Sequence, residues 1–177
     1  MDNNVSFRVH KDELADAAAW VARSLPTKST QPVLRAVVIT ADDNGLEFAG
    51  FDYEVSTRVR IGAEVNEPGR VAVAGKLLAD IVGTMPNDAI EVSTDSKVMT
   101  LKARSSRFEL PLIALDDYPQ LPHLPEVTGR ISPAALTGAV TQVASAAGRD
   151  DTLPMLTGIH LEIDGENVTL TATDRFR

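Results

Sequence analysis

Hydrophobic and polar residues follow two regular patterns along the chain. In some stretches apolar residues recur every three or four positions, as on one face of a helix; in others they alternate with polar residues, as in a half-buried strand. The first pattern predicts helices at 11–24, 74–84 and 133–147. The second predicts strands at 5–9, 33–41, 46–50, 55–61, 71–73, 89–92, 98–103 and 108–113. Strand, helix and three strands are therefore expected twice, in that order, within 1–115.

Residues at the ends of these elements support the assignment. Asn44 and Gly45 predict a tight hairpin turn, because both tolerate positive φ. Ser132 is expected to be the N-cap of the last helix, with Pro133 in its first turn. Gly148 is expected to end that helix in a left-handed conformation, with the helix burying its apolar side.

A repeat relates the two ends of the chain. The segment PVLRAVVITADDNGLEFAGFDYE at 32–54 returns as PMLTGIHLEIDGENVTLTATDRF at 154–176, 122 residues later. The same offset pairs Asp52 with Asp174 without a gap. One structural unit is therefore expected twice, with the second copy reaching the equivalent of Val55.

A proline-rich segment separates the two copies. Pro119, Pro122 and Pro125 lie three residues apart, which removes backbone donors and favours a stiff, extended chain. We expect a first domain at 1–115, a linker at 116–128 and the first part of a second domain at 129–177. A first domain of about 120 residues is large enough for its own core, whereas the incomplete second copy is expected to be marginally stable.

Composition narrows the class of protein. The chain has 177 residues, 44% of them hydrophobic and 24% charged, and no apolar run near the ~18 residues of a membrane span, which predicts a soluble globular protein. It has no cysteine, which excludes disulfides and thiolate zinc sites and suits the cytoplasm. The N-terminal sequence does not resemble a signal peptide. A net charge of −8 argues against coating nucleic acid through overall basicity, so any such contact needs a local basic surface.

Candidate catalytic chemistry is sparse. His10, His123 and His160 lack partners at the spacing of a metal site, so we interpret them as structural or solvated residues. Asp52 and Asp174 occupy matched positions, which favours a shared turn over catalysis. A nuclease that uses either carboxylate is the weaker alternative. We expect no catalytic residue, no metal and no cofactor.

Basic residues gather near the ends of the predicted helices, at Arg23, Lys28, Lys76 and Arg149. Acidic residues concentrate in the hairpin turns and in the linker. If the helices share one side of a sheet, that side would be basic or neutral. A solvated face without a partner remains the alternative interpretation of the same charges.

The sequence resembles a known family. The PVLRAVVI and LPMLTGIHLEI segments, the GRDDTLPML run and the RFELPLIALDDYPQLP segment are similar to the bacterial DNA polymerase III β subunit, the replication sliding clamp, and most of all to the version in high-GC Gram-positive bacteria. The resemblance covers 1–177. It implies an α+β DNA-clamp fold, in which each domain doubles a βαβββ unit with helices on one face and antiparallel sheets on the other. The chain would then correspond to about one and a half of the three domains of that family.

The resemblance also implies a function. In this family two three-domain protomers close head to tail into a ring around DNA, so the implied role is a non-catalytic processivity factor. The implied partners are duplex DNA, bound without sequence specificity, and the polymerase III alpha subunit, the clamp loader and repair polymerases, bound through short peptide motifs. A homodimer of the full-length protein, a cytoplasmic location and no membrane contact follow. The alternative is a β-rich protein-interaction module that does not encircle DNA.

Three sets of residues carry these expectations. Lys28 and Lys76 match basic pore positions of the family, Arg149 lies beside a contact position, and Arg23 is inferred from its place near a helix end. One wall of the peptide pocket is expected at Leu156, Thr173, Arg175, Phe176 and Arg177, although the family often has glycine and histidine at the third and fourth of these positions. The subunit-interface edge is expected at Lys97, Lys102, Arg104 and Arg107. Lysines that merely protect a strand edge from aggregation are the alternative for this last set.

Overall fold

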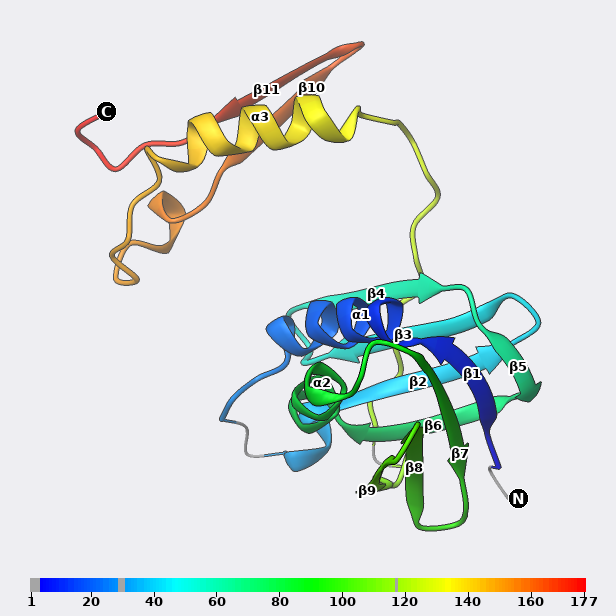
Figure 1. The fold of residues 1–177 in the computed structure, drawn as a ribbon. Helices are drawn as coiled ribbons and strands as arrows, with labels where there is room; N and C mark the ends of the chain where they lie inside the picture. Colours follow the sequence, from blue (N-terminus) through cyan, green and yellow to red (C-terminus); the bar gives the residue numbers. More distant parts are fainter. Residues whose placement is uncertain (1–3, 29–30, 117) are drawn as a thin grey trace. The chain divides into compact units, whose positions relative to one another are not determined.

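The computed structural model describes residues 4–28, 31–116 and 118–177. The chain forms two compact units, Met1–His123 and Leu124–Arg177, which are described separately (Figure 1). The expected linker at 116–128 spans the boundary between them, so the division expected from the sequence stays a prediction. Among the described residues, no helix has both the length and the apolar character needed to cross a membrane.

Two antiparallel sheets and two helices build the first unit (Figure 1). The five-stranded sheet has the order β5 (Glu64–Glu67), β1 (Ser6–His10), β7 (Ala89–Thr94), β8 (Val98–Ala103), β9 (Ser106–Pro111). The four-stranded sheet has the order β4 (Ser56–Ile61), β3 (Gly45–Phe51), β2 (Ala36–Asp42), β6 (Gly69–Ala74). The helices α1 (Lys11–Ser24) and α2 (Gly75–Thr84) pack against each other. This arrangement is the expected α+β class, with the strand–helix–three-strand order present twice.

The two halves of the first unit exchange their first strands. Strand β1 pairs with β7 of the second half, with Phe7 opposite Val92. Strand β6 pairs in turn with β2 of the first half, with Val38 opposite Ala72. Each sheet therefore contains strands from both halves, and an isolated bridge joins Val73 on β6 to Leu112, the residue after β9.

Helix α1 has the bounds that its sequence pattern predicts. Its N-cap is His10, whose Nδ1 accepts a hydrogen bond from the Asp12 backbone N–H at 3.4 Å. Its inward face buries Leu14, Ala17 and Val21, each at most 2% exposed, in the main core. Burial of this apolar face is the main source of stability for a helix of this length.

The strand predicted at 33–41 begins later than expected. Pro32–Arg35 form a 3-10 helix (η1), and β2 starts at Ala36. The Leu34 N–H bonds to the Gln31 carbonyl at 3.2 Å, which closes the helical turn and takes this donor away from a sheet. Strand β5 was not predicted, and the strand predicted at 108–113 lies at 106–111 in the structure.

The second unit consists of α3 (Pro133–Ala144), the 3-10 helix η2 (Pro154–Leu156) and a hairpin of β10 (His160–Asp164) and β11 (Asn167–Thr171). Ser132 occupies the N-cap position of α3, as predicted, but its side chain makes no capping hydrogen bond. The prediction that α3 buries its apolar side was wrong: none of its residues is fully buried, and Leu136 and Val140 are each 37% exposed. A two-stranded hairpin is too small to enclose the helix as the first unit encloses α1.

The expected left-handed cap at Gly148 was also wrong. Helix α3 ends at Ala144, with Ser145 as a right-handed C-cap, and Gly148 does not have a positive φ. The Gly148 N–H instead donates to the Leu156 carbonyl oxygen at 2.7 Å. A Cβ at this position would lie 3.2 Å from the same oxygen, so the glycine permits a close approach of two backbone segments.

Candidate DNA and partner surfaces

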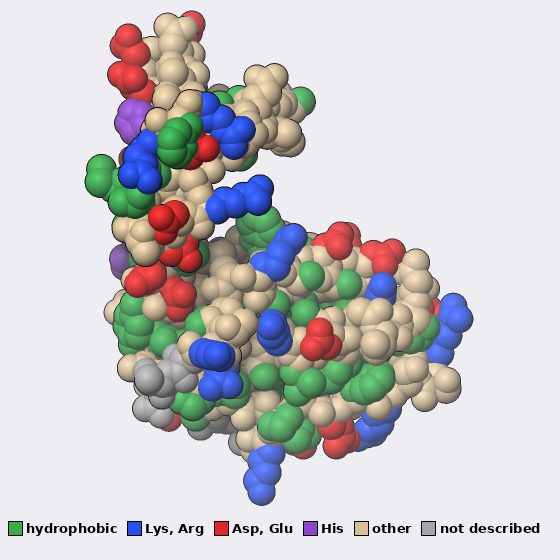
Figure 2. Space-filling view, turned by 90° about the vertical axis from the view of Figure 1, so that its left-hand side faces the viewer, with side chains coloured by type: hydrophobic (Ala, Val, Ile, Leu, Met, Phe, Trp, Pro, Cys, Tyr) green, Lys and Arg blue, Asp and Glu red, His purple; other side chains and the backbone are tan. Residues whose placement is uncertain are grey.

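Three of the four candidate DNA-binding residues lie in the first unit, at or near helix ends. Arg23 occupies the last turn of α1, with its guanidinium 5.3 Å from the centre of the Trp20 ring. Lys76 is the second residue of α2, and Lys28 follows α1; all three basic side chains are exposed. Figure 2 shows Lys and Arg side chains spread over this unit among hydrophobic and acidic ones. Arg149 lies in the second unit, after α3.

The N-terminal end of α1, opposite Arg23, carries acidic side chains. Asp12 and Glu13 lie in its first turn, where the helix dipole favours negative charge. Arg23 lies in its last turn, where the dipole favours a cation. The charged side chains of α1 therefore change from mainly acidic in its first turn, where Lys11 pairs with Asp12, to basic at Arg23 in its last turn.

The candidate interface residues lie on or beside β8 and β9, the last two strands of the five-stranded sheet. Lys102 on β8 lies opposite Arg107 on the edge strand β9, and opposite Glu91 on its other side. Arg104 lies in the turn between β8 and β9, with an uncommon φ of 51°. Lys97 precedes β8. Lys102, Arg104 and Arg107 therefore lie close together at one end of the β8–β9 hairpin, whereas Lys97 lies at the opposite end of β8. Their assignment to a subunit interface stays a prediction.

Two of these four basic residues, Arg104 and Arg107, already form ion pairs within the chain. Arg104 Nε lies 2.8 Å from Asp88 Oδ2, and this hydrogen bond lowers the pKa of the Asp88 carboxyl. Arg107 Nη2 lies 2.6 Å from Glu109 Oε1 on the same strand. Neither Lys97 nor Lys102 has an ion pair within 4.0 Å among the described residues. These two lysines therefore carry most of the charge that the edge could offer to an acidic partner.

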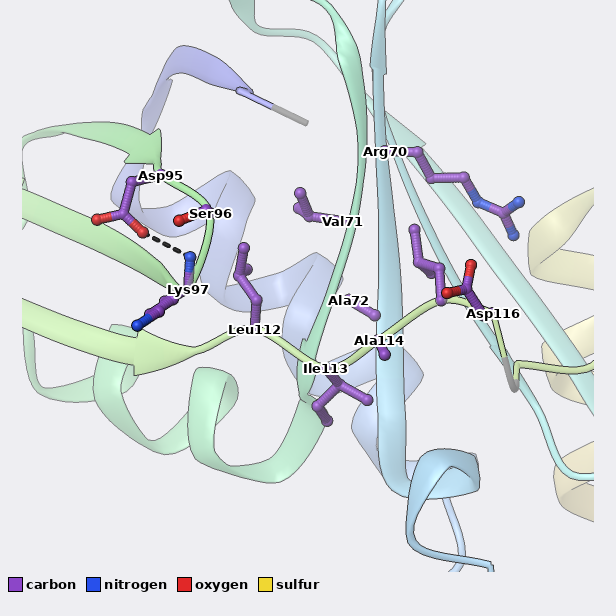
Figure 3. A pocket seen from close by; sticks show the side chains of 11 residues that line it. Arg70, Val71, Ala72, Asp95, Ser96, Lys97, Leu112, Ile113, Ala114 and Asp116 are labelled. Carbon is purple, nitrogen blue, oxygen red and sulfur yellow. Dashed lines mark hydrogen bonds between the residues drawn. The ribbon is translucent and has the colours of Figure 1, made fainter. Parts of the chain in front are cut away.

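A crevice of about 770 Å³ is lined by Lys97 but by none of the other three candidate interface residues (Figure 3). It lies between β6 and the turn at 95–97, with segment 112–116 along its floor. Asp95 fixes that turn, because its Oδ1 accepts the backbone N–H groups of Lys97 at 2.6 Å and Val98 at 2.8 Å, bonds that lower its pKa. Charged groups of both signs line the crevice, so its electrostatics favour neither an anionic nor a cationic ligand.

Four of the five candidate peptide-pocket residues lie in one turn, whose residues are hydrogen-bonded to one another. Thr173 Oγ1 accepts the Arg175 N–H at 3.1 Å and donates to the Arg177 carbonyl at 2.7 Å. Asp174 Oδ1 accepts the N–H groups of Phe176 at 3.0 Å and Arg177 at 3.2 Å, and the first of these bonds does most to lower its pKa. The Phe176 ring is 88% exposed at the tip of this turn. Leu156 belongs to a separate element, the end of η2.

The geometry of the two matched aspartates supports a structural role. Asp52 and Asp174 each accept two backbone N–H groups through Oδ1, which is the bonding of an aspartate that fixes a turn. In the described ranges, no three His, Asp or Glu side chains come together in a way that could hold a metal ion.

Two residues of structural importance were missed. Tyr118 is only 9% exposed and its hydroxyl accepts the Phe51 N–H at 2.9 Å, although the sequence places it in a linker. Arg58 donates to the Pro122 carbonyl. The spacing of three between the apolar residues Leu115, Tyr118 and Leu121 was the available signal, because an extended proline-rich chain has three residues per turn and so gives them one face.

Comparison with known families settles the relationship of the chain. Residues 5–122 match the family described as DNA polymerase III beta subunit, N-terminal domain, and residues 130–177 match the central domain of the same subunit. The chain belongs to the DNA polymerase III beta subunit family. The two matched regions follow each other in the order expected from the internal repeat.

Relatives within the beta subunit family support the finer resemblance. The beta sliding clamp of Streptomyces coelicolor is 49% identical over 173 residues, which is 98% of this chain and 46% of that protein. The clamp of Micrococcus luteus is 44% identical over 98% of this chain and 56% of its own length. The clamp of Bacillus subtilis is only 26% identical. The chain is therefore most similar to the high-GC Gram-positive type, and it spans about half the length of these relatives.

Solved structures of the beta subunit family have the same fold. A sliding clamp of Pseudomonas aeruginosa bound to griselimycin is 28% identical and superposes with a TM-score of 0.83 over 97% of this chain and 47% of that one. The Bacillus subtilis sliding clamp, at 24% identity, superposes with a TM-score of 0.82 and shows the fold alone. Both comparisons confirm the DNA-clamp fold.

Proposed function

We propose that the chain is part of a sliding clamp, a non-catalytic processivity factor that encircles duplex DNA as a ring and tethers DNA polymerase III. The observation that carries this proposal is the consecutive match of two beta subunit domains over 5–122 and 130–177. The clamps of Streptomyces coelicolor and Micrococcus luteus support it by their similarity over 98% of the chain. A cytoplasmic location accompanies this role.

Arg23, Lys28, Lys76 and Arg149 would contact DNA phosphates. Their exposure and their places near helix ends support this assignment. Contacts of this kind are independent of sequence, and four of them would give a slope of about −3.6 for log K against log salt. Such binding weakens sharply with salt, which suits a protein that has to slide.

Two other surfaces would bind proteins. The turn at Thr173–Arg177, together with Leu156, would form one wall of a pocket for short peptide motifs of polymerases and the clamp loader, and the exposed Phe176 ring supports this assignment. The edge with Lys97, Lys102, Arg104 and Arg107 would meet an acidic edge of a second protomer in the full-length homodimer. Lys97 and Lys102, which lack ion-pair partners among the described residues, would contribute most there.

Salt-dependent DNA binding tests the proposal. Fluorescence anisotropy with a labelled duplex gives the binding constant K between low and moderate salt. A plot of log K against log salt should be linear, and its negative slope should become less steep by about 0.9 in each of the variants Arg23→Ala, Lys28→Ala and Lys76→Ala. Lys97→Ala is the matched control, because it removes the same charge from the other surface. Equal effects of Lys97→Ala and Lys76→Ala, or no binding at low salt, would favour the interaction module without DNA encirclement.

A further inference from the structure

Residues 113–123, hereafter the strap, lie across one face of the four-stranded sheet. On β2, Val37 and Ile39 point into the main core, whereas Ala36 and Val38 belong to a second apolar cluster on the opposite face. Tyr118 is the strap's buried contribution to that second cluster. The strap is therefore packed against the first unit, except that residue 117 lies outside the described residues.

Hydrogen bonds attach the strap to three strands. The Ile113 N–H donates to the Ala72 carbonyl on β6 at 2.8 Å. The Phe51 N–H at the end of β3 donates to the Tyr118 hydroxyl at 2.9 Å. Arg58 on β4 donates from Nη2 to the Pro122 carbonyl, and its Nε is buried. Because β6 and β4 are the two outer strands of the sheet, these attachments extend across its whole width.

The apolar spacing shows where the attachment ends. Leu115, Tyr118 and Leu121 recur every three residues and pack in the second cluster. Leu124 and Val127 continue the same spacing but are 69% and 80% exposed. The sequence pattern is continuous here, yet the burial stops between residues 121 and 124.

We propose that Tyr118 and Arg58 are positioning residues that hold the strap on the sheet, so that the joint between the two units is Leu124–Ile131 rather than the whole proline-rich segment. The hydroxyl of Tyr118 fixes the middle of the strap and the guanidinium of Arg58 fixes its end. Chain movement then begins after His123. The inference rests on the contacts of the first unit and does not require that the chain bind DNA.

A shorter joint has a consequence for assembly, and this consequence rests on the proposed function. Releasing the strap at 113–123 would lengthen the joint from 124–131 to 113–131, by about 2.4-fold, and the reach of a flexible chain grows with the square root of its length, by about 1.5-fold here. The effective concentration of one unit near the other falls with the −3/2 power of that length, to roughly a quarter. A held strap therefore favours the alignment of consecutive domains that closing a ring requires.

Site-directed spin labelling tests the inference on the full chain. The protein has no cysteine, so the single replacements Gln120→Cys and Glu126→Cys give one label in the strap and one in the joint. The label at 120 should be immobilised and the label at 126 mobile. Arg58→Ala should convert the spectrum at 120 to the mobile form and leave that at 126 unchanged. Arg60→Ala is the matched control, because Arg60 lies two residues further along β4 and bonds to Asp42 and Glu47 instead of the strap.

Two results would overturn the inference. One is equal mobility at 120 and 126 in the parent chain, since the strap would then not be held. The other is release of the label at 120 by Arg60→Ala as strongly as by Arg58→Ala, since the effect would then reflect the loss of a charge from the strand. Tyr118→Phe, which keeps the ring and removes the hydroxyl, provides a second variant should Arg58→Ala fail to fold, and Trp20 fluorescence in urea reports whether each variant is folded.

Discussion

Asp52 and Asp174, which the sequence repeat pairs, build the same hydrogen-bonded turn in the two units. Asp52 Oδ1 accepts the N–H groups of Glu54 at 3.0 Å and Val55 at 2.7 Å, as Asp174 Oδ1 does for the two residues at the same spacing. The residue after each aspartate has a positive φ, 75° at Tyr53 and 77° at Arg175. The repeat therefore preserves backbone geometry even where the side chains differ.

Replacing Asp52 by Ala should destabilise the first unit by about 1–2 kcal/mol, because two backbone N–H groups lose their acceptor. Asp52→Asn should cost less, since its amide oxygen still accepts. Asp43→Ala, in the nearby hairpin turn, is the control with the same charge change. Urea unfolding followed by the fluorescence of Trp20, the single tryptophan and part of the first unit, measures all three. Equal losses for Asp52→Asn and Asp52→Ala would show that hydrogen bonding is not the cause.

Gly45→Ala should destabilise the first unit by more than about 2 kcal/mol, because a left-handed backbone and a steric clash both penalise a side chain there. Gly45 has a φ of +104°, and a Cβ would lie 2.4 Å from the Ile61 carbonyl oxygen. Gly83→Ala in α2 should have the opposite sign and stabilise by about 0.5–1 kcal/mol, because nothing lies within 4 Å of its Cβ and alanine favours a helix. Thermal unfolding tests both variants: the unfolding temperature should fall in Gly45→Ala and rise in Gly83→Ala.

Acid should weaken the first unit through its ion-paired carboxylates. The hydrogen bond from Arg60 holds the pKa of Asp42 below its usual value, and Arg104 does the same for Asp88. A carboxyl whose pKa is lower in the folded state stabilises it above the unfolded pKa of about 3.9, and this contribution is lost as pH falls further. Urea midpoints should therefore decline below pH ~4, and less steeply in the double variant Asp42→Asn, Asp88→Asn. An equally steep decline in that variant would assign the effect to other groups.

Alkali should weaken the same unit through Tyr118. Burial raises the pKa of its hydroxyl, so the neutral form stabilises the folded state below the usual tyrosine value of about 10, and this contribution is lost as pH rises through the higher folded value. The difference in ultraviolet titration between the parent and Tyr118→Phe isolates this group. Its midpoint should lie above 10; a midpoint at or below that value would contradict the burial of the strap.

Local patterns were sufficient for the strongest elements. Helix α1 has its predicted bounds because its apolar period is regular and Pro26 follows closely. Strand β8 likewise coincides with the predicted 98–103. Helix η1 was not predicted, because the apolar residues Val33 and Leu34 are typical of a strand. In the structure Pro32 instead begins a helical turn over these residues. Strand β5 was missed because its sequence, EVNE, has little apolar character and its pairing with β1 is a long-range contact.

The candidate surfaces were predictable in composition but not in pairing. The clustering of Lys102, Arg104 and Arg107 followed from their places on one predicted hairpin. The ion pair between Asp88 and Arg104 could not be predicted in this way, because the two residues lie in different turns that only the folded sheet brings together. The packing of Tyr118 on a sheet face could not be predicted for the same reason, since its partners Ala36, Val38 and Ala72 lie on strands 46 to 82 positions earlier in the chain.

The exchange of first strands between the halves of the first unit bears on how the protein is made. Strand β1 is synthesised before β5 and β7 but lies between them, so its two pairings cannot both form until residue 94 has been synthesised. At about 5–20 residues per second, that wait lasts roughly 4–16 s. During it, Val5, Phe7 and the apolar face of α1 have no finished core to enter, and the nascent chain is exposed to premature association. Cellular chaperones that hold emerging apolar segments should therefore matter most while the segment between β1 and β7 is being synthesised.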